Sequence, residues 1–499
     1  MAEQPPFLRE IDTLIRARYP LLYLVTFEEQ RVEGLLGEIA RAHGKDLVEW
    51  SATRGLRTFT GAHRGEPVEG TADPVAALMY IHKLTKPSIV ILKDFHRHLE
   101  DALVVRALRE LGNALKAAYT TVVVLAPTLR LPEELEKDVS VVDVPLPTKA
   151  DLLQLLREIA RLVTKNRKAT IDLNAEQADS LVSAAHGLTL SEAENAFAKA
   201  IAQDNRLDGS DLRLILDEKS QVIRKSGLLE YYATDQAMTD VGGLTHLKRW
   251  LERRKNAFSD AARDFGLPSP KGLLLLGVQG CGKSLTAKAI ATSWKLPLVR
   301  LDMGRIYSGL VGSSEENLRK AIRAVESLAP VVLWVDEVEK GLAGSSGSND
   351  TGVSARVFGT LLTWLQEKTS PVFVVATANR IESLPPELLR KGRFDEIFFV
   401  DLPSEEERLE IFNIQLKRRK RDPAKFPVAE LAKITAQFSG AEIEQLVVSG
   451  LYDAFADGVE LTADHLLIAA KETPPLAVTM AEGVARLRDW ARTRTRPAS

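Results

Sequence analysis

Short apolar runs recur along the second half of the chain, separated by longer segments in which apolar residues follow helical spacing. The runs cover residues 273–276, 331–335 and 371–377, and residues 285–295 are typical of a helix that follows the first run. Apolar runs of this length fit buried strands. The pattern therefore predicts an α/β fold in which helices flank a parallel sheet.

The first half of the chain repeats this pattern at a distance of about 250 residues. The aligned segments are residues 89–95 with 331–337, 122–126 with 372–376, and 144–147 with 400–403. We interpret the first half as a second α/β domain related to the other. The alternative is that any two α/β domains of similar layout would align this well, because the likeness lies mostly in apolar runs.

The remaining segments are predicted to be mainly helical. They cover residues 151–162 and 175–202 in a first lid, 211–232 in a connector, and 404–473 in a second lid. In the tail, Val484, Leu487, Trp490 and Ala491 follow roughly helical spacing, and we expect Trp490 to pack onto the core. Residues 493–499 are expected to be disordered.

The run at residues 273–276 leads into the pattern G-x-x-x-x-G-K-S, formed by Gly277, Val278, Gln279, Gly280, Cys281, Gly282, Lys283 and Ser284. A strand, a glycine loop and a helix in this order bind phosphate, because backbone N–H groups surround the anion at the helix N-terminus. Lys283 is placed to reach the β- and γ-phosphates, and the Ser284 hydroxyl to hold Mg²⁺. A chance match would lack this context, so the motif predicts a nucleoside triphosphate site. Cys281 is interpreted as a small filler.

Polar residues follow the next two strands in the sequence. Asp336 and Glu337 end the run at 331–335, where Asp336 is predicted to hold Mg²⁺ through water and Glu337 to polarise the attacking water. Asn379 follows the run at 371–377 and is predicted to lie beside the γ-phosphate, although by itself it would fit a turn-forming residue equally well. Arg390 and Arg393 follow, either as surface charges or as arginine fingers that stabilise the transferring phosphate.

Composition narrows the choice of partners. The chain has 499 residues, a net charge of −2 and a pI near 6.5, which gives no electrostatic footprint for nucleic acid. The basic run at 417–421 is interpreted as a solvated helix end. One cysteine excludes an intramolecular disulfide, and no apolar run approaches the ~18 residues of a membrane span. Residues 1–20 do not resemble a signal peptide, so we expect a cytoplasmic protein, or a stromal one if it is plastid-encoded.

Together these motifs resemble the AAA family of ATPases over residues 235–475. The resemblance implies ATP and Mg²⁺ as cofactors, Asn379 as sensor 1, and Arg390 and Arg393 as fingers that reach a neighbour's nucleotide in a hexamer. It adds Asp240, Val241, Gly242, Leu285, Gly440 and Ala441 to the nucleotide site, and Arg356 to the subunit contacts. Two positions depart from the family pattern: Gln415 replaces a histidine near the ribose, and Leu310 replaces an aromatic residue of the first pore loop.

Three stretches, residues 343–348, 356–367 and 487–491, resemble an AAA family found in bacteria and as a chloroplast open reading frame. The predicted domains are a degenerate AAA-like α/β domain (1–147), its helical lid and connector (148–232), the large ATPase subdomain (233–403), its helical lid (404–475), and a C-terminal helix and tail (476–499). The first domain lacks phosphate ligands, because residues 26–30 contain no glycine or lysine. The alignment places Phe95 at the Glu337 position and Leu129 at the Asn379 position.

Two functions remain open. The first is an ATP-hydrolysing ring that remodels a protein client, and the second is an ATP-dependent scaffold that does not thread a substrate. The scaffold function stays open because the aliphatic Leu310 replaces the aromatic residue of the first pore loop. A nucleic-acid motor is disfavoured because the composition provides no basic surface. A built-in protease is disfavoured because no H-E-x-x-H motif is present.

Overall fold

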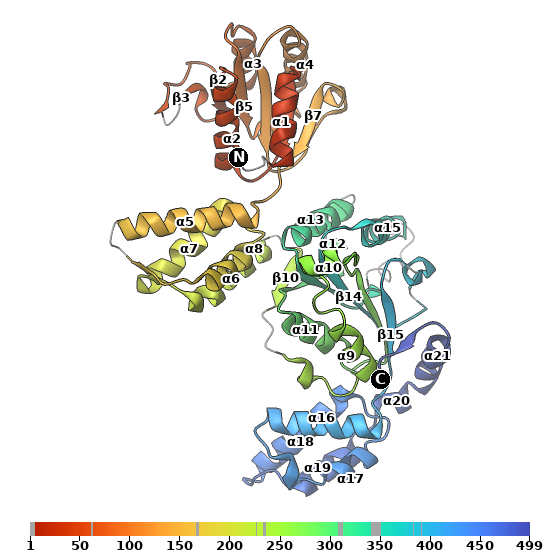
Figure 1. Ribbon diagram of the computed structural model, residues 1–499. Coiled ribbons are helices and arrows are strands. Elements are labelled where there is room, and N and C mark those ends of the chain that lie inside the picture. Colours follow the sequence, from red (N-terminus) through yellow and green to blue (C-terminus); the bar gives the residue numbers. More distant parts are fainter. Residues whose placement is uncertain are drawn as a thin grey trace. The chain divides into compact units, whose positions relative to one another are not determined.

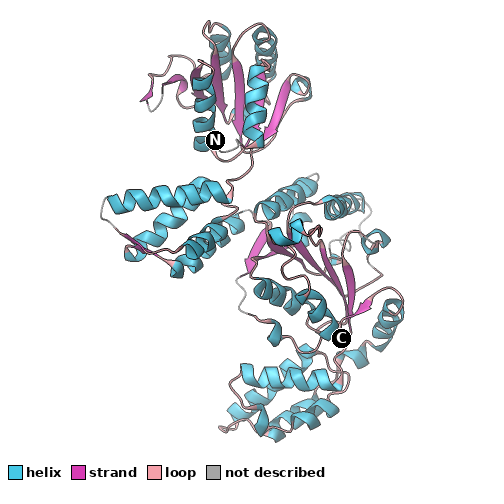
Figure 2. Ribbon diagram, viewed as in Figure 1, coloured by secondary structure: helices cyan, strands magenta, loops and turns pink. Residues whose placement is uncertain are grey.

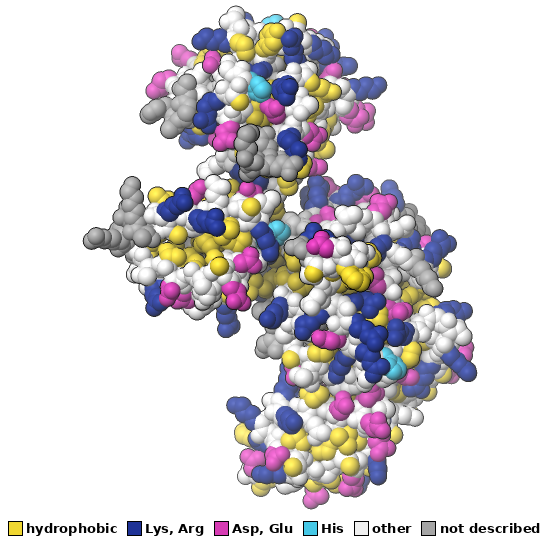
Figure 3. Space-filling model, in the orientation of Figure 1, with side chains coloured by type: hydrophobic (Ala, Val, Ile, Leu, Met, Phe, Trp, Pro, Cys, Tyr) yellow, Lys and Arg dark blue, Asp and Glu magenta, His cyan; other side chains and the backbone are white. Residues whose placement is uncertain are grey.

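The chain forms two compact units, residues 1–215 and residues 216–499, each built around a seven-stranded sheet (Figure 1). In this computed structural model the described residues are 5–60, 63–165, 169–225, 227–232, 236–307, 313–340, 351–382, 384–390 and 392–499. Helices flank the sheet in each unit, so the predicted α/β class is confirmed (Figure 2). The face that Figure 3 shows carries both acidic and basic side chains, and a group of basic ones gathers over the second unit.

The sheet of the first unit has the strand order β4-β3-β2-β5-β6-β1-β7. Its strands are β1 (Leu21–Val25), β2 (Asp46–Ser51), β3 (Gly55–Thr60), β4 (His63–Arg64), β5 (Ser88–Lys93), β6 (Thr121–Ala126) and β7 (Val139–Asp143). Helices α1 (Pro6–Arg16) and α2 (Glu29–Ala42) pack on one face, and α3 (Pro74–His82) and α4 (Ala102–Leu115) on the other. The five strands from β2 to β7 in this order are parallel.

A helical lid follows in the same unit. It consists of α5 (Lys149–Lys165), α6 (Ala175–Ala185) and α7 (Leu190–Asp204), with the short strands β8 (Thr170–Ile171) and β9 (Arg206–Leu207) paired in parallel. Helix α8 (Leu212–Lys225) then spans the boundary between the two units.

The sheet of the second unit has the order β10-β12-β13-β14-β11-β15-β16. Its strands are β10 (Leu229–Tyr232), β11 (Gly272–Gly277), β12 (Leu298–Leu301), β13 (Val331–Val335), β14 (Val372–Ala378), β15 (Glu396–Val400) and β16 (Arg496–Pro497). The helices around it are α9 (Thr245–Glu252), α10 (Asp260–Asp264), α11 (Lys283–Trp294), α12 (Met303–Tyr307), α13 (Ser313–Ser327) and α15 (Thr351–Glu367).

A second helical lid completes the unit. It contains α16 (Glu405–Arg418), α17 (Val428–Ile434), α18 (Gly440–Ala456) and α19 (Ala463–Glu472), and is followed by α20 (Leu476–Thr479) and α21 (Ala481–Ala491). Leu487 is buried in the core of the large subdomain and Trp490 packs against it, which confirms the expectation for this helix.

Burial of both sheet faces explains why the central strands are continuously apolar. Along β11, Leu273 and Leu275 contact the core beneath α11, whereas Leu274 and Leu276 contact the opposite core, and all four are fully buried. Alternate residues of a strand point to opposite faces, so a strand covered by helices on both sides must be apolar throughout. The site residues can therefore lie only at the strand ends.

The two sheets share one topology. The order β2-β5-β6-β1-β7 matches the order β12-β13-β14-β11-β15. In both units the fourth of these strands, β1 or β11, is followed by a helix, α2 or α11. Asp94 (φ 52°) and Glu337 (φ 47°) both adopt the left-handed conformation just after matching strands. The Lys93 side chain contacts Glu33 of α2, and the Asp336 side chain contacts Ser284 of α11. Lys93 therefore corresponds to Asp336, and Asp94 corresponds to Glu337. The alignment of Phe95 with Glu337 was wrong by one residue.

Two segments differ from the sequence prediction. Residues 229–232 were expected to be helical but form β10, because Leu229 and Tyr231 alternate onto the core and the backbone pairs antiparallel with β12. Residues 493–499 were expected to be disordered, yet β16 pairs in parallel with β15 and Ala498 is buried. The free backbone groups at the edge of a sheet favour such an added strand. The predicted Leu310 lies outside the described residues.

Candidate functional site

The glycine loop lies between β11 and α11, at the carboxyl edge of the sheet. A side chain at Gly277 (φ 155°) would place its Cβ 1.9 Å from the Val400 carbonyl oxygen of β15, so only glycine fits there. Gly280 (φ 78°) approaches the lid, where its carbonyl accepts a hydrogen bond from the Ala441 N–H at 3.0 Å. The loop is therefore fixed by the sheet on one side and by the start of α18 on the other.

Lys283 begins α11 and is 6 % exposed. Its Nζ donates to the carbonyl oxygens of Gly277 at 2.9 Å and Val278 at 2.7 Å. Burial lowers the pKa of this ammonium group to about 8. Backbone carbonyls compensate a buried positive charge only in part, so the group is suited to an anionic ligand.

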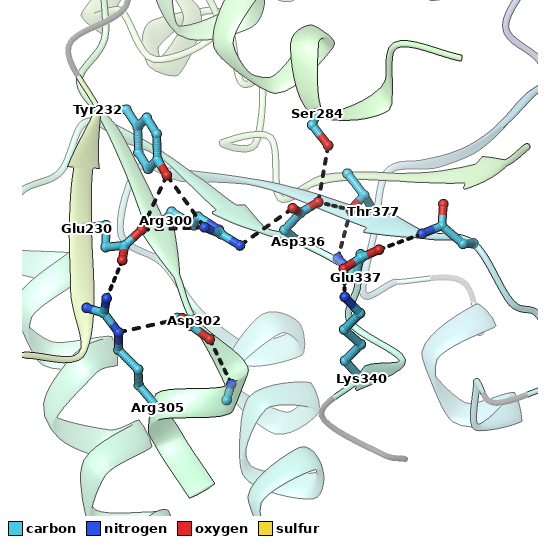
Figure 4. Close-up of polar contacts among 12 residues, drawn as sticks. Glu230, Tyr232, Ser284, Arg300, Asp302, Arg305, Asp336, Glu337, Lys340 and Thr377 are labelled. Atoms are coloured by element: carbon cyan, nitrogen blue, oxygen red, sulfur yellow. Dashed lines mark hydrogen bonds and ion pairs between the residues drawn. The ribbon is translucent and has the colours of Figure 1, made fainter. Parts of the chain in front are cut away.

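Asp336 follows β13 and lies beside two hydroxyl groups (Figure 4). One belongs to Thr377 near the end of β14, and the other to Ser284 just after the glycine loop. Its Oδ1 accepts hydrogen bonds from Thr377 Oγ1 at 2.7 Å and from Ser284 Oγ at 3.3 Å. A hydroxyl and a carboxylate side by side are hard oxygen ligands of the kind that Mg²⁺ prefers. The two residues predicted to hold the metal are thus brought together.

Glu337 is held by three groups. Asn379 Nδ2 donates to Glu337 Oε1 at 2.9 Å, the Glu337 backbone N–H donates to Thr377 Oγ1 at 2.9 Å, and Lys340 forms an ion pair with the other carboxylate oxygen. Figure 4 shows these contacts at the edge of the sheet. The carboxylate is therefore oriented rather than free, and the residue predicted to act as sensor touches it directly.

A cavity of about 710 Å³ connects these groups. The predicted residues that line it are Asp240, Val241, Gly242, Gln279, Gly280, Cys281, Gly282, Lys283, Ser284, Leu285, Asp336, Glu337, Asn379, Gly440 and Ala441. Gly277 and Val278 are not among the lining residues, but their carbonyls hold Lys283. Burial raises the pKa of the Cys281 thiol to about 12, so it stays protonated and inert, as expected of a filler.

The arginine pair lies away from the cavity of its own chain. Arg390 is exposed after the short 3₁₀ helix η5 (Pro386–Leu389), and Arg393 is partly exposed and donates to the Glu387 carbonyl. Neither lines the cavity among the described residues. Within one chain the structure therefore does not bring Arg390 and Arg393 to Glu337.

Sequence reasoning missed several residues of the site. Thr377 joins Asp336 to Glu337, and its place two residues before Asn379 on one strand was a usable signal, because such residues share a face. Glu339 is buried and accepts the Asn379 N–H at 2.8 Å, and burial raises the pKa of its carboxyl. In α16, Glu407 and Glu410 accept the N–H groups of Leu244 and Gly243, and no motif indicated them.

Comparisons with known proteins agree with this geometry. The family model described as "ATPase family associated with various cellular activities (AAA)" matches residues 273–402. The models for the N-terminal and second domains of SpoVK-like AAA ATPases match residues 7–144 and 150–226. The "Uncharacterized AAA domain-containing protein ycf46" of Pyropia yezoensis is 40% identical over 492 residues, covering 97% of both chains. The chain belongs to the AAA ATPase family.

Other relatives extend this result. The ycf46 protein of Guillardia theta is 40% identical over 489 residues, covering 97% of this chain and 95% of its own. The "ATPase family protein 2 homolog" of Caenorhabditis elegans is 27% identical over 402 residues, 77% of this chain and 52% of that protein. Among the described residues of this AAA protein, no helix has both the length and the apolar character needed to cross a membrane.

The AAA chain fills the matching site of its first unit with its own charges. Only Thr26, Phe27 and Glu28 separate β1 from α2. At the Asp336 position, Lys93 forms ion pairs with Glu33 and, at 3.1 Å, with Glu49. Both glutamates are buried, so a cation supplied by the protein occupies the place where a metal ligand would lie.

Glu28 makes the contact between this core and its lid. Its Oε1 accepts the Leu190 N–H at the start of α7 at 2.7 Å, and its Oε2 pairs with Arg31 at 2.6 Å. In the second unit the Gly280 carbonyl accepts a hydrogen bond from the Ala441 N–H at the start of the matching lid helix. The first lid is thus held by a side chain of the protein itself.

We predict that Lys93→Met lowers the free energy of unfolding of the first unit by about 1–3 kcal/mol, because Glu33 and Glu49 lose a shared cation in a buried site while Arg64 still pairs with both and Arg57 with Glu49. Calorimetry of the full chain measures this as a shift of the transition that belongs to this unit. Lys116→Met is the control, since Lys116 is exposed and pairs with Asp138 only at 3.8 Å. Equal shifts for both variants would contradict the account.

Proposed function

We propose that this AAA protein hydrolyses Mg-ATP and acts as a homo-oligomeric ring, a hexamer, that remodels a protein client. The observation that carries the proposal is the convergence of Lys283, Ser284, Asp336, Glu337 and Asn379 on one cavity. A buried cation, a hydroxyl–carboxylate pair and an oriented second carboxylate are the parts that phosphoryl transfer to water requires.

The residues fit Mg-ATP. The glycine loop offers backbone N–H groups at the N-terminus of α11, and Lys283 supplies the charge for the phosphates. Ser284 and Asp336 would hold Mg²⁺, which neutralises charge on the phosphate oxygens when bound. Glu337 would accept a proton from the attacking water, and the hydrogen bond from Asn379 holds its carboxylate in place.

The oligomeric ring is supported by the place of the arginine pair. Arg390 and Arg393 lie outside the cavity of their own chain, so they can stabilise a transferring phosphate only on another subunit. A head-to-tail contact that repeats in this way closes into a ring when its rotation allows. The family commonly forms such assemblies, and the arginine positions suit that arrangement.

A scaffold that uses ATP for assembly without threading a client is the second candidate, favoured by the aliphatic Leu310. Stimulation of ATPase activity by unfolded protein distinguishes the two. A nucleic-acid partner is disfavoured, because the net charge is −2.

Separating binding from chemistry tests the site. Lys283→Ala should weaken nucleotide binding at least tenfold, since a buried ligand of the phosphates is removed. Glu337→Gln should retain binding but lose about 10²-fold or more of the hydrolysis rate, because the amide cannot accept a proton. Equilibrium binding of a fluorescent ATP analogue and phosphate release measure the two effects. Normal turnover by Glu337→Gln would remove its proposed role.

Hydrolysis should require a neighbouring subunit. Arg390→Ala leaves every ligand of its own cavity intact, so this variant should bind ATP and hydrolyse poorly. Lys283→Ala subunits keep their arginines, so mixing the two inactive variants should restore part of the ATPase rate. A rate that stays at the sum of the separate variants, although mixed assemblies form, would refute the trans arrangement.

Nucleotide affinity should depend on pH through Lys283. Its pKa of about 8 in the free protein rises when phosphate binds, so affinity is full below pH 8 and falls as pH rises through 8, by up to about tenfold per unit. Titrations with Mg-ADP between pH 6.5 and 9.5 measure this. Lys283→Arg, which stays charged, should flatten the profile; an unchanged slope would assign the dependence to another group.

A further inference from the structure

A partly exposed arginine lies between the proposed metal ligand and the edge strand of the sheet. Arg300 of β12 approaches Asp336 Oδ2 at 3.7 Å with one guanidinium nitrogen, and Glu230 Oε2 and the Tyr232 hydroxyl at 3.5 Å with another. Its guanidinium lies 5.2 Å from the centroid of the Trp334 ring. Figure 4 shows Arg300 between Asp336 and Glu230.

Asp336 divides its two oxygens between different partners. Oδ1 takes the hydroxyls of Thr377 and Ser284, whereas Oδ2 faces Arg300. A guanidinium beside this carboxylate offsets the negative charge that would attract Mg²⁺ and also fixes its orientation. Arg300 therefore competes with the metal for Asp336.

Glu230 is the second carboxylate beside Arg300. It lies directly opposite Arg300 in the β10–β12 pairing, and its other oxygen pairs with Arg305 of α12 at 2.5 Å. Arg300 lies between two carboxylates. If it moves closer to Glu230, its distance from Asp336 increases and the attraction between Arg300 and Asp336 weakens. Strand β10 follows α8, so the connector carries this carboxylate into the ATPase sheet.

We propose that Arg300 competes with magnesium for Asp336, and that Glu230 of the connector strand sets the magnesium affinity through it. The proposal rests on the proposed function, since it concerns the same Mg-ATP site. It makes β10 a regulatory element: a displacement of this strand changes the charge at Asp336 without any contact with nucleotide. A binding partner that displaces the connector strand would change the magnesium affinity in this way.

A double-mutant cycle in the full chain tests the coupling, with Glu337→Gln as the parent so that ATP is not consumed. The probe is a fluorescent ATP analogue, and the readout is the Mg²⁺ concentration that gives half of the magnesium-dependent binding. Glu230→Gln should raise this concentration about three- to tenfold, because Arg300 is left to Asp336 alone. Arg300→Gln should lower it by a similar factor. In the double variant the effect of Glu230→Gln should disappear.

Two controls complete the experiment. Arg300→Lys keeps the positive charge and should stay closer to the parent than Arg300→Gln does. Lys255→Gln removes a charge from a pair with Glu252 away from the cavity and should leave the magnesium requirement unchanged. A parent that does not bind the analogue would refute the proposed function. A parent that binds it, with the same Glu230→Gln shift in the presence and absence of Arg300, would refute only the coupling.

Discussion

A half-buried charge at the carboxyl end of a parallel strand must be neutralised by the protein or by a ligand, and the two units of this chain meet that requirement in opposite ways. In the first unit Lys93, together with Arg57 and Arg64, neutralises Glu33 and Glu49 within the fold. In the second unit Lys283 has only backbone carbonyls, and Asp336 has hydroxyls and a shared arginine. The same scaffold is therefore closed by its own charges in one unit and left open to a charged ligand in the other.

The precision of the open site depends on the rigidity of the strands beneath it. Residues 372–378 of β14 are all buried, and this strand carries Thr377 and Asn379 at its end. A strand packed on both faces cannot shift without disturbing two cores. The lid contacts the glycine loop through a backbone hydrogen bond to Gly280 and the segment before α9 through Glu407 and Glu410, so lid movement and the shape of the cavity are linked.

Much of this could be predicted from the sequence, because the motif spacing carries both the fold and the chemistry. The glycine loop, Asp336, Glu337 and Asn379 lie where the alternation of strands and helices placed them. The role of Lys93 could not be predicted, since an ion pair with Glu33 and Glu49 leaves no periodic signal and the alignment was shifted by one residue. Strands β10 and β16 were missed for a related reason: short edge strands form because a neighbouring strand offers unpaired backbone groups, and local sequence does not report the neighbour.

The central claim is that, of two sites at matching places in related sheets, one is closed by the protein's own charges and the other is open to nucleotide. The number of ATP molecules bound per chain at saturation, measured by equilibrium dialysis with Mg²⁺ on the Glu337→Gln variant, tests it most directly. The account predicts no more than one per chain, and loss of that binding when Lys283→Ala is added. Two per chain, or binding that survives Lys283→Ala undiminished, would contradict it.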